Sequence, residues 1–351
     1  MLKDLVEELL PSNFAPLKPR SRAAVARRAH NPKVGGSNPP FATITDPQVI
    51  RFEDFLFLYF CTSMKSGFVN IFGRPNAGKS TLLNALIGEK LAIVSFKAQT
   101  TRHRIKGILT ADDYQIIFSD TPGIIEPKYK LHEKMMQAVK GSLEDADVAL
   151  LIVDVKDDLQ EANQTFTSLK LKVPAIVIIN KSDVCDEKTI QQAKEFFLLQ
   201  SYCKEVAVIS ALKRKGIEEL LKSILNLLPE GEPFYEGDNL SDLPTKFFVG
   251  ELIREKIFYL YQDEIPYHST VLVQEFKEKQ TLVKITADII LQRETQKGIV
   301  LGEGGRMIKQ LGTEARKDIE QFLGRKVFLE LFVKVRPKWR DNELQLREYG
   351  Y

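Results

Sequence analysis

The fold of this chain is decided by the stretch Gly73-Arg74-Pro75-Asn76-Ala77-Gly78-Lys79-Ser80-Thr81. It fits the phosphate-binding pattern G-x-x-x-x-G-K-[ST], with a short apolar run before it and helically spaced apolar residues after it. Glycines let backbone N–H groups turn toward a phosphate, and the N-terminus of the helix that follows adds partial positive charge. Lys79 can reach the β- and γ-phosphates, and the Ser80 hydroxyl can ligate Mg²⁺. The pattern therefore predicts a nucleotide-binding α/β domain with phosphate contacts from Gly73, Asn76, Ala77, Gly78, Lys79, Ser80 and Thr81.

The overall composition indicates a globular protein with more than one domain. Of its 351 residues, 44% are hydrophobic and 28% are charged, as in soluble globular proteins, and this length predicts about two or three domains. The formal net charge is only +3, so the chain as a whole is not drawn strongly to nucleic acid or membrane. The 3 cysteines are scattered and form no C-x-x-C pair, which favours a reducing, cytoplasmic compartment. No apolar run reaches the length of about 18 residues that a membrane helix needs.

Residues 1–63 differ in composition from the rest of the chain. Met1–Leu10 can form one short amphipathic helix, but the basic, Pro- and Gly-rich stretch after it has no apolar period and favours disorder. The stretch 27–40 looks like the peptide obtained when a tRNA gene is read as protein, and Met64 stands just before the first expected strand. We expect residues 1–63 to be an over-extended reading frame and Met64 to be the natural start. The alternative is a disordered basic tail that adds affinity for RNA.

From residue 64 to about residue 230, apolar strands alternate with helical patterns, which predicts a mostly parallel sheet. We expect strands at Gly67–Phe72, Ile105–Leu109, Tyr114–Ser119, Val148–Asp154, Ala175–Asn180 and Glu205–Ser210. We expect helices at Thr81–Ile87, His132–Leu143, Gln160–Leu169, Thr189–Leu199 and Gly216–Leu228. Residues 231–244, with Gly, Pro and several acidic residues, are typical of a linker.

Three further motifs each follow an apolar strand, at the edge where a doubly wound sheet presents its ligand crevice. In Asp120-Thr121-Pro122-Gly123, the carboxylate can hold Mg²⁺ and the Gly123 N–H can contact a γ-phosphate. In Asn180-Lys181-Ser182-Asp183, the last carboxylate can accept two N–H groups of guanine, which adenine does not offer on that edge. Ser210-Ala211-Leu212 can supply a backbone N–H to the guanine O6. Each motif alone is also typical of a polar turn, but together they predict GTP as the ligand, with base contacts from Asn180, Lys181, Asp183, Ser210 and Ala211.

The segment 245–351 has a different pattern, that of an α+β domain. We expect a helix at Thr245–Gln262, strands near His268–Phe276 and Thr281–Arg293, and a closing strand at Lys326–Val335. Between the second and third of these strands, Gly302-Glu303-Gly304-Gly305 separates two helical stretches. From Gln296 to Arg340 there are eleven basic and five acidic residues, which is an electrostatic footprint for a polyanion. A helix–helix turn with a solvated charged face is the alternative, but the element order together with the charge favours RNA binding.

These motifs, in this order, resemble the translation-factor-like class of P-loop GTPases. Within that class, Gln99-Thr100-Thr101-Arg102-His103-Arg104 followed by Gly107-Ile108 is similar to the Era family. The segment with the GXXG loop resembles a type II KH domain, and Lys338-Trp339-Arg340 through Tyr351 resembles the Era C-terminus. The resemblance covers about Met64 to Tyr351: a GTPase domain at 64–230 and a KH domain with its tail at 245–351.

The resemblance implies a GTP-hydrolysing switch that binds the 3′ end of 16S rRNA through its KH domain. Such a protein assists 30S (small) ribosomal subunit assembly and rRNA processing, and we expect it to be a monomer. The implied RNA contacts are Gly302, Glu303, Gly304, Gly305, Arg306 and Lys309. The implied switch residues are Thr100, Thr101, Asp120, Thr121 and Pro122. The implied Mg²⁺ ligands are Ser80, Asp120 and one switch threonine, with Thr101 our choice and Thr100 the alternative.

Four positions qualify this reading. Ile124 stands where Ras-like proteins carry a water-orienting glutamine, so hydrolysis should be slow. Asn76 either is similar to the asparagine that holds K⁺ in some relatives or serves only as a turn residue. Leu212 replaces a lysine common in GTPases, but that contact is made mostly by the backbone. Glu303 stands where lysine is common in KH loops and should lower affinity for phosphate.

A second class of function stays open at this stage. A regulatory GTPase could act through a protein partner, or at the cytoplasmic face of the inner membrane, where its basic C-terminal face would meet anionic lipid. Gly305→Asp separates the two classes, because a contact made through the GXXG loop should collapse whereas attraction to lipid should lose only about one charge's contribution.

Overall fold

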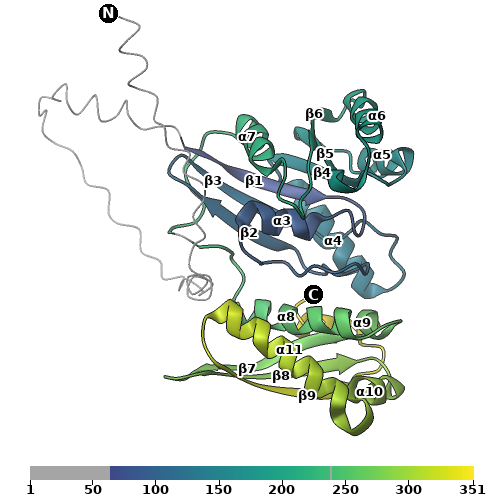
Figure 1. The fold of residues 1–351 in the computed structure, drawn as a ribbon, viewed down its shortest axis with the longest axis vertical. Helices are drawn as coiled ribbons and strands as arrows, with labels where there is room; N and C mark the ends of the chain where they lie inside the picture. Colours follow the sequence, from purple (N-terminus) through teal and green to yellow (C-terminus); the bar gives the residue numbers. More distant parts are fainter. Residues whose placement is uncertain (1–63, 238) are drawn as a thin grey trace, which may run out of the picture.

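The computed structural model describes residues 64–237 and 239–351, so the predictions for residues 1–63 lie outside the described residues. A larger α/β domain is stacked on a smaller α+β domain, and the chain passes from one to the other near residue 240 (Figure 1). The predicted fold class, a mostly parallel α/β domain followed by an α+β domain, is confirmed.

A six-stranded sheet in the order β2-β3-β1-β4-β5-β6 forms the centre of the larger domain. β2 is antiparallel to β3, and the other neighbours are parallel. The strands are β1 (Lys65–Phe72), β2 (Ile105–Thr110), β3 (Tyr114–Asp120), β4 (Val148–Asp154), β5 (Ala175–Asn180) and β6 (Cys203–Val208). The last strand ends earlier than predicted, because Ser210 pairs with Lys215 across a turn instead.

Helices cover both faces of this sheet. One face packs against α3 (Lys79–Ile87) and α7 (Ile217–Leu227), and the other against α4 (Lys130–Glu144), α5 (Leu159–Ser168) and α6 (Glu187–Leu198). Successive residues of a strand point to opposite faces, so β4 serves both layers. Its residues Val148, Leu150 and Ile152 join the first layer, and Ala149, Leu151 and Val153 join the second. Burial on both faces is the reason that the central strands read as unbroken apolar runs.

The described parts of the predicted linker, residues 231–237 and 239–244, bind the β2–β3 side of the larger domain's sheet. The Ile108 N–H donates to the Leu240 carbonyl at 2.9 Å. The Gln115 side chain binds the Tyr235 backbone twice, donating to its carbonyl and accepting from its N–H, each at 2.9 Å. These bonds satisfy backbone groups at the edge of the sheet that would otherwise be unpaired, and they hold the segment against the larger domain.

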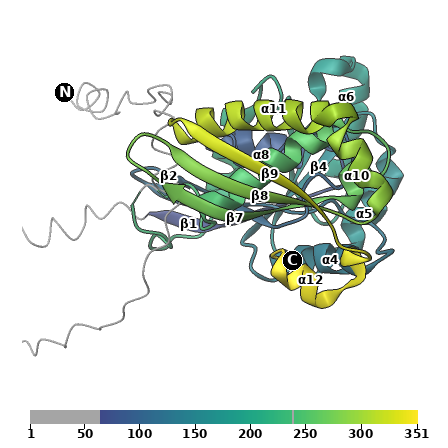
Figure 2. The ribbon, with the colours of Figure 1, turned by 90° about the horizontal axis from the view of Figure 1, so that it is seen from below.

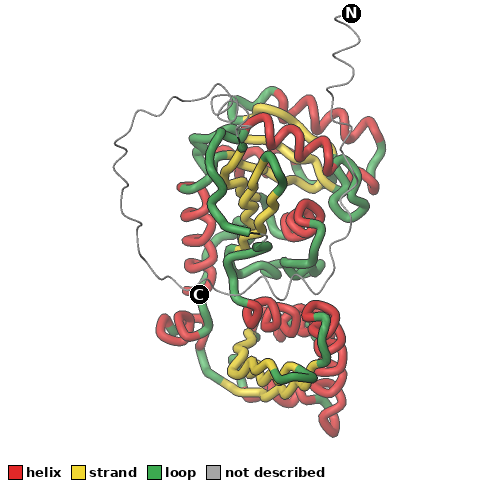
Figure 3. The backbone as a smooth tube through the Cα atoms, turned by 90° about the vertical axis from the view of Figure 1, so that its left-hand side faces the viewer, coloured by secondary structure: helices red, strands yellow, loops and turns green. Residues whose placement is uncertain are grey.

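A three-stranded sheet in the order β7-β8-β9 forms the smaller domain, with β7–β8 antiparallel and β8–β9 parallel. Helices α8 and α11 pack on one face of this sheet, and α8 lies on the side toward the larger domain (Figures 1 and 3). The strands are β7 (Thr270–Glu278), β8 (Val283–Leu291) and β9 (Val327–Val335). The helices are α8 (Thr245–Leu260), α9 (Ile265–His268), α10 (Glu294–Leu301) and α11 (Arg306–Leu323). The short helix α9 is an addition to the predicted order.

The C-terminal tail returns to the larger domain. It forms a 3₁₀ turn (Trp339–Asp341) and α12 (Glu343–Glu348), and α12 lies beside α4 (Figure 2). Trp339 is fully buried against Leu131 and Met135 of α4. The tail is therefore a second connection between the two domains, in addition to the linker. Neither the 3₁₀ turn nor α12 was predicted.

Candidate nucleotide site and RNA interface

The predicted phosphate loop connects β1 to α3 and has no room for side chains at two of its glycines. A Cβ at Gly73 would lie 2.4 Å from the Ile152 carbonyl oxygen. Gly78 has a φ of 103°, and a Cβ there would lie 2.2 Å from Asn180 Nδ2. The first N–H groups of α3 have no acceptor within the helix, so they can serve a phosphate in this loop.

Lys79 lies beneath the loop and is only 6% exposed. Its ammonium donates to the carbonyls of Gly73 at 3.1 Å and Arg74 at 2.8 Å. Burial lowers the pKa of Lys79 to about 8, although the carboxylate of Asp120 acts in the opposite direction. A cation that is held with so little water is stabilised further by an anionic ligand.

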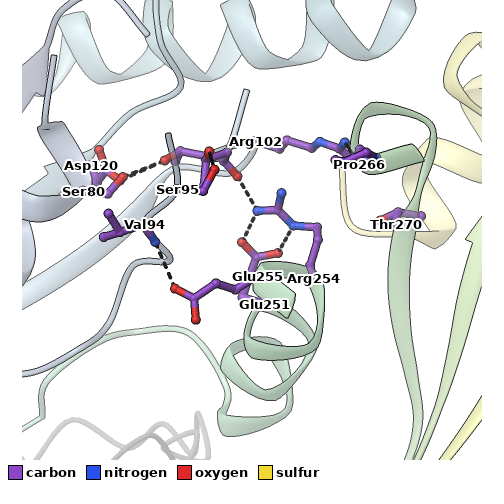
Figure 4. Close-up of polar contacts among 12 residues, drawn as sticks. Ser80, Val94, Ser95, Arg102, Asp120, Glu251, Arg254, Glu255, Pro266 and Thr270 are labelled. Atoms are coloured by element: carbon purple, nitrogen blue, oxygen red, sulfur yellow. Dashed lines mark hydrogen bonds and ion pairs between the residues drawn. The ribbon is translucent and has the colours of Figure 1, made fainter. Parts of the chain in front are cut away.

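The predicted Mg²⁺ ligands come together where β3, α3 and the loop between α3 and β2 meet (Figure 4). Ser80 Oγ lies 2.6 Å from Asp120 Oδ2 and 2.8 Å from Thr101 Oγ1, and Thr101 Oγ1 lies 3.2 Å from the same carboxylate oxygen. Among the described residues, Asp120 Oδ1 is buried without a hydrogen-bond partner. Burial also raises the pKa of Asp120, against the effects of Lys79 and the two hydroxyls. Three oxygen donors with one unsatisfied carboxylate oxygen fit a hard divalent cation.

The two switch threonines lie in different surroundings. The Thr100 hydroxyl donates to the Lys97 carbonyl at 2.6 Å and lies 2.9 Å from Ser95 Oγ, within its own loop. Only the Thr101 hydroxyl reaches Ser80 and Asp120.

Asn180 ties the phosphate loop to the predicted base-binding loop. Its Nδ2 donates to the Ala77 carbonyl at 2.9 Å, and its Oδ1 accepts the Ala211 N–H at 3.0 Å. Of the three backbone N–H groups that we expected could serve the guanine O6, that of Ala211 has an acceptor in Asn180 and that of Ser210 has one in the Lys215 carbonyl. Asn180 is 2% exposed, so it connects the two loops from inside the protein.

Asp183 is open to solvent at the rim of the site. Its Oδ1 accepts a hydrogen bond from Ser210 Oγ at 2.5 Å. This hydrogen bond is the main reason that the pKa of Asp183 is lowered, so the side chain is a carboxylate ready to accept N–H donors. Lys181 has a φ of 63° and forms an ion pair with Asp154, the last residue of β4.

One cavity of about 620 Å³ unites these groups, a volume in the range of small-ligand sites. It is lined by the phosphate loop, the loop between α3 and β2, Gly123 and both base motifs. The predicted site residues among its lining are Asn76, Gly78, Lys79, Ser80, Thr81, Thr100, Thr101, Gly123, Asn180, Lys181, Asp183 and Ser210.

The second switch, which is the segment that follows β3 from Asp120 onward, begins on well-anchored backbone. Thr121 is buried and donates its hydroxyl to the Ile71 carbonyl at 2.7 Å, and Pro122 after it is also buried. A Cβ at Gly123 would lie 2.8 Å from Pro75, so the second switch touches the phosphate loop. The Ile124 side chain packs on the core beneath α4, α5 and α6.

Asn76 lies in a turn, and its side chain contacts the loop between α3 and β2. It has a φ of 64°, as a turn residue would, and its Nδ2 donates to the Phe96 carbonyl at 2.9 Å. Its side chain thus lies beside a carbonyl of the loop between α3 and β2, in the same cavity as the phosphate loop.

The GXXG loop connects α10 to α11. Gly302, Gly304 and Gly305 all have positive φ, at 69°, 58° and 77°, so the loop backbone follows a path that most side chains would oppose. Glu303 forms an ion pair of 2.5 Å with Arg306, and both side chains are largely exposed. Lys309 is exposed on the first turns of α11. The loop therefore presents Glu303 and Arg306 as an exposed ion pair, and the lower phosphate affinity expected from Glu303 stays a prediction.

Sequence reasoning missed the residues that join the two domains at the first switch. These residues are Lys97 and Arg102 on the switch side and Glu251, Arg254 and Glu255 on α8. The one available signal was the spacing of Glu251 and Arg254, which allows a helical ion pair. No local pattern relates them to the switch.

The fold and the sites together define a P-loop GTPase joined to a KH domain. The family described as 50S ribosome-binding GTPase matches residues 68–181, and the KH domain family matches residues 264–340. The chain belongs to the Era family of GTPases. GTPase Era of Geotalea uraniireducens is 44% identical over 293 residues, and GTPase Era of Thermoanaerobacter sp. is 42% identical over 291 residues. Each alignment covers 82% of this chain, with 98% and 96% of the respective relatives.

Two solved structures agree with this assignment. One is Era in complex with MgGDPNP and nucleotides 1506–1542 of 16S ribosomal RNA, with 41% identity and a TM-score of 0.78. The other is a variant of Aquifex aeolicus Era bound to GDP·AlF₄⁻, with 40% identity and a TM-score of 0.79. Each match covers 82% of this chain and 99% of the other.

Proposed function

We propose that this chain hydrolyses GTP and, as a switch, binds 16S rRNA in assembly of the small ribosomal subunit. The observation that carries the proposal is the joining of two sites in one chain. The cavity beside the phosphate loop holds base, phosphate and metal-ligand groups together, and the GXXG loop lies in the second domain. A solved Era with 41% identity to this chain contains both MgGDPNP and a 16S rRNA fragment.

Different residues of the chain bind the phosphates, the guanine and the Mg²⁺ of the nucleotide. Lys79 and the N–H groups at the start of α3 bind and orient the phosphates. Asp183, oriented by Ser210, accepts N–H groups of the guanine, and Asn180 keeps the base loop and phosphate loop at a constant separation. Ser80, Thr101 and Asp120 would hold Mg²⁺, which neutralises charge on the β- and γ-phosphate oxygens when bound.

Slow hydrolysis follows from the side chain after the second-switch glycine. Ile124 offers no hydrogen bond to a water, and its partly buried side chain packs against the core beneath α4, α5 and α6. Positioning of the attacking water must then depend on other groups, and turnover without a stimulating partner should be low.

K⁺ is the additional cation that we propose for this site. Asn76 and the Phe96 carbonyl lie together at the cavity, and both carry oxygen atoms of the kind that bind alkali cations. A cation there would add positive charge near the phosphates.

RNA binding by the KH domain has a direct test. A 16S 3′-end oligonucleotide should bind the full chain, with different affinity in the GDPNP and GDP forms, and Gly305→Asp should abolish most of that binding. Gly141→Asp is the matched control, because Gly141 lies on α4 with open space around it and carries the same change of charge into the GTPase domain. Equal loss in both variants would refute an RNA contact at the GXXG loop.

We further propose that the protein is a cytoplasmic monomer whose basic face makes a peripheral contact with the inner membrane. Within residues 64–237 and 239–351, no helix has the length and apolarity to cross a membrane. Flotation with anionic vesicles tests the membrane contact, and sedimentation tests the oligomeric state. Binding of Gly305→Asp to such vesicles at nearly the parent level would separate lipid attraction from RNA recognition.

A further inference from the structure

Helix α8 of the KH domain holds the first switch of the GTPase domain, and the inference below rests on the function just proposed. The loop that connects α3 to β2, residues 88–104, is here called the switch loop. It meets α8 at several points (Figure 4). The Val94 N–H donates to Glu255 Oε1 at 3.2 Å, and the Lys97 ammonium donates to the Phe258 carbonyl at 2.5 Å near the C-terminal end of α8.

Arg254 makes the contact closest to the nucleotide. Its Nη2 donates to the Thr100 carbonyl at 2.5 Å. The same guanidinium forms two hydrogen bonds with Glu251, at 2.7 Å from Nε and 2.5 Å from Nη2. The side chains of Arg254 and Glu251 are 1% and 8% exposed. The pair is thus a buried, bidentate unit that presents one N–H to one switch-loop carbonyl.

The Thr100 carbonyl belongs to the peptide that precedes Thr101. Because a peptide group is planar, a donor that holds this carbonyl also sets the direction from which the backbone enters Thr101. Thr101 then points its hydroxyl at Ser80 and Asp120, at 2.8 and 3.2 Å. Arg254 is therefore connected to the metal-ligand cluster through only the Thr100–Thr101 peptide and the Thr101 side chain.

We propose that the Arg254–Glu251 pair is a positioning element for the Mg²⁺ and γ-phosphate site: it holds the Thr100 peptide so that the Thr101 hydroxyl faces Ser80 and Asp120. The element lies on the RNA-binding domain, so the geometry of the GTPase site depends on how α8 is docked. The two residues act through Thr101 and touch no nucleotide themselves.

Charge and burial support this assignment. Burial by itself would raise the pKa of Glu251, but the adjacent Arg254 lowers it below its ordinary value, so the pair stays ionised. A buried arginine whose charge is balanced by its own carboxylate can donate to a neutral carbonyl without leaving an unpaired charge. On the switch side, Arg102 adds a second buried anchor, with Nη1 donating to the Ser269 carbonyl at 2.7 Å.

The test compares Arg254→Met in the full chain with the parent protein. Without the donor, the Thr100 peptide is free to turn, so single-turnover GTP hydrolysis should fall by about tenfold or more, as for loss of a buried charge-assisted hydrogen bond. The Mg²⁺ concentration for half-maximal rate should rise. GDP affinity should stay within about twofold, because the Thr101 hydroxyl serves the γ-phosphate side of the site. Arg254→Lys, which keeps one donor, should recover part of the rate.

A double-mutant cycle separates positioning from general loosening of the fold. In a Thr101→Ala background, Arg254→Met should change the rate by less than about twofold, because the group that Arg254 positions is already absent. Lys256→Ala removes an ion pair of α8 that does not involve the switch loop, the 2.5 Å pair with Asp318 of α11. That control should keep the parent rate and Mg²⁺ dependence.

The combined variant Glu251→Leu/Arg254→Met covers the case in which an unpaired Glu251 unfolds Arg254→Met. It removes both charges of the buried pair together, and its fold is checked by circular dichroism. A folded variant with the parent rate and Mg²⁺ dependence would overturn the proposal, as would full additivity with Thr101→Ala. A parent protein that hydrolyses no GTP would instead refute the proposed function itself.

Discussion

Asn180→Ala gives the sharpest test of how the nucleotide site is held together. The Asn180 side chain joins the Ala77 carbonyl at 2.9 Å to the Ala211 N–H at 3.0 Å, at 2% exposure. Removing the side chain breaks both bonds, and the buried Ala77 carbonyl and Ala211 N–H then lack this partner. At about 1–2 kcal/mol for each bond, the free energy of unfolding should fall by about 2–4 kcal/mol.

Nucleotide affinity should fall as well, because the base loop and the phosphate loop must lie at a constant distance from each other to bind the two ends of one nucleotide. If the bound nucleotide has to restore the spacing of the two loops, up to the same about 2–4 kcal/mol is lost from binding, or about 30- to 1,000-fold in affinity. Fluorescent GDP and GTP analogues measure this directly, and urea denaturation measures stability.

Gln115→Ala is the matched control for this prediction. Gln115 is also buried and also binds one backbone carbonyl and one backbone N–H, both of Tyr235, each at 2.9 Å. It should therefore cost similar stability while leaving nucleotide affinity close to the parent value. If Asn180→Ala binds GTP within about threefold of Gln115→Ala, a difference below about 1 kcal/mol, the idea that Asn180 couples the two loops is wrong.

Three further predictions concern the base, the cation and pH. Asp183→Asn should weaken GTP binding and shift preference toward xanthine nucleotides, since an amide can donate to the 2-oxo group; equal affinity of the parent for GTP and ATP would contradict the assignment. Turnover should be slow, require Mg²⁺ and run faster in K⁺ than in Na⁺, with the difference lost in Asn76→Ala; equal parent rates would remove the K⁺ proposal. Burial is the largest cause that lowers the pKa of three histidines to about 4, namely His103, His132 and His268. Because these values lie below the ordinary 6.5, the unfolded chain binds more protons between pH 6.5 and about 4, and stability should fall as the pH drops through that window. Urea denaturation at pH 7 and pH 5 measures it, and equal stabilities would refute it.

The local motifs were readable from sequence because their chemistry is contained in a few consecutive residues. The stretch from Gly73 to Thr81 identifies the phosphate loop by its glycines. Only glycine tolerates the φ of 103° at position 78 and the close approach to Ile152 at position 73. The strands of the larger domain were readable because burial on both faces makes them unbroken apolar runs. The GXXG loop was readable for the same reason as the phosphate loop.

Tertiary structure decided what depends on residues far apart in the chain. Sequence does not say which of Thr100 and Thr101 faces Asp120, because neighbouring residues of the same type differ only in direction. In the fold, the Thr101 hydroxyl contacts Asp120 and the Thr100 hydroxyl donates to the Lys97 carbonyl. The ion pair between Glu303 and Arg306 was not predicted either, because it is a matter of side-chain geometry. The bond from Arg254 to the Thr100 carbonyl spans 154 residues. No local pattern encodes such a bond, since it exists only when α8 and the switch loop pack together and exclude water from both.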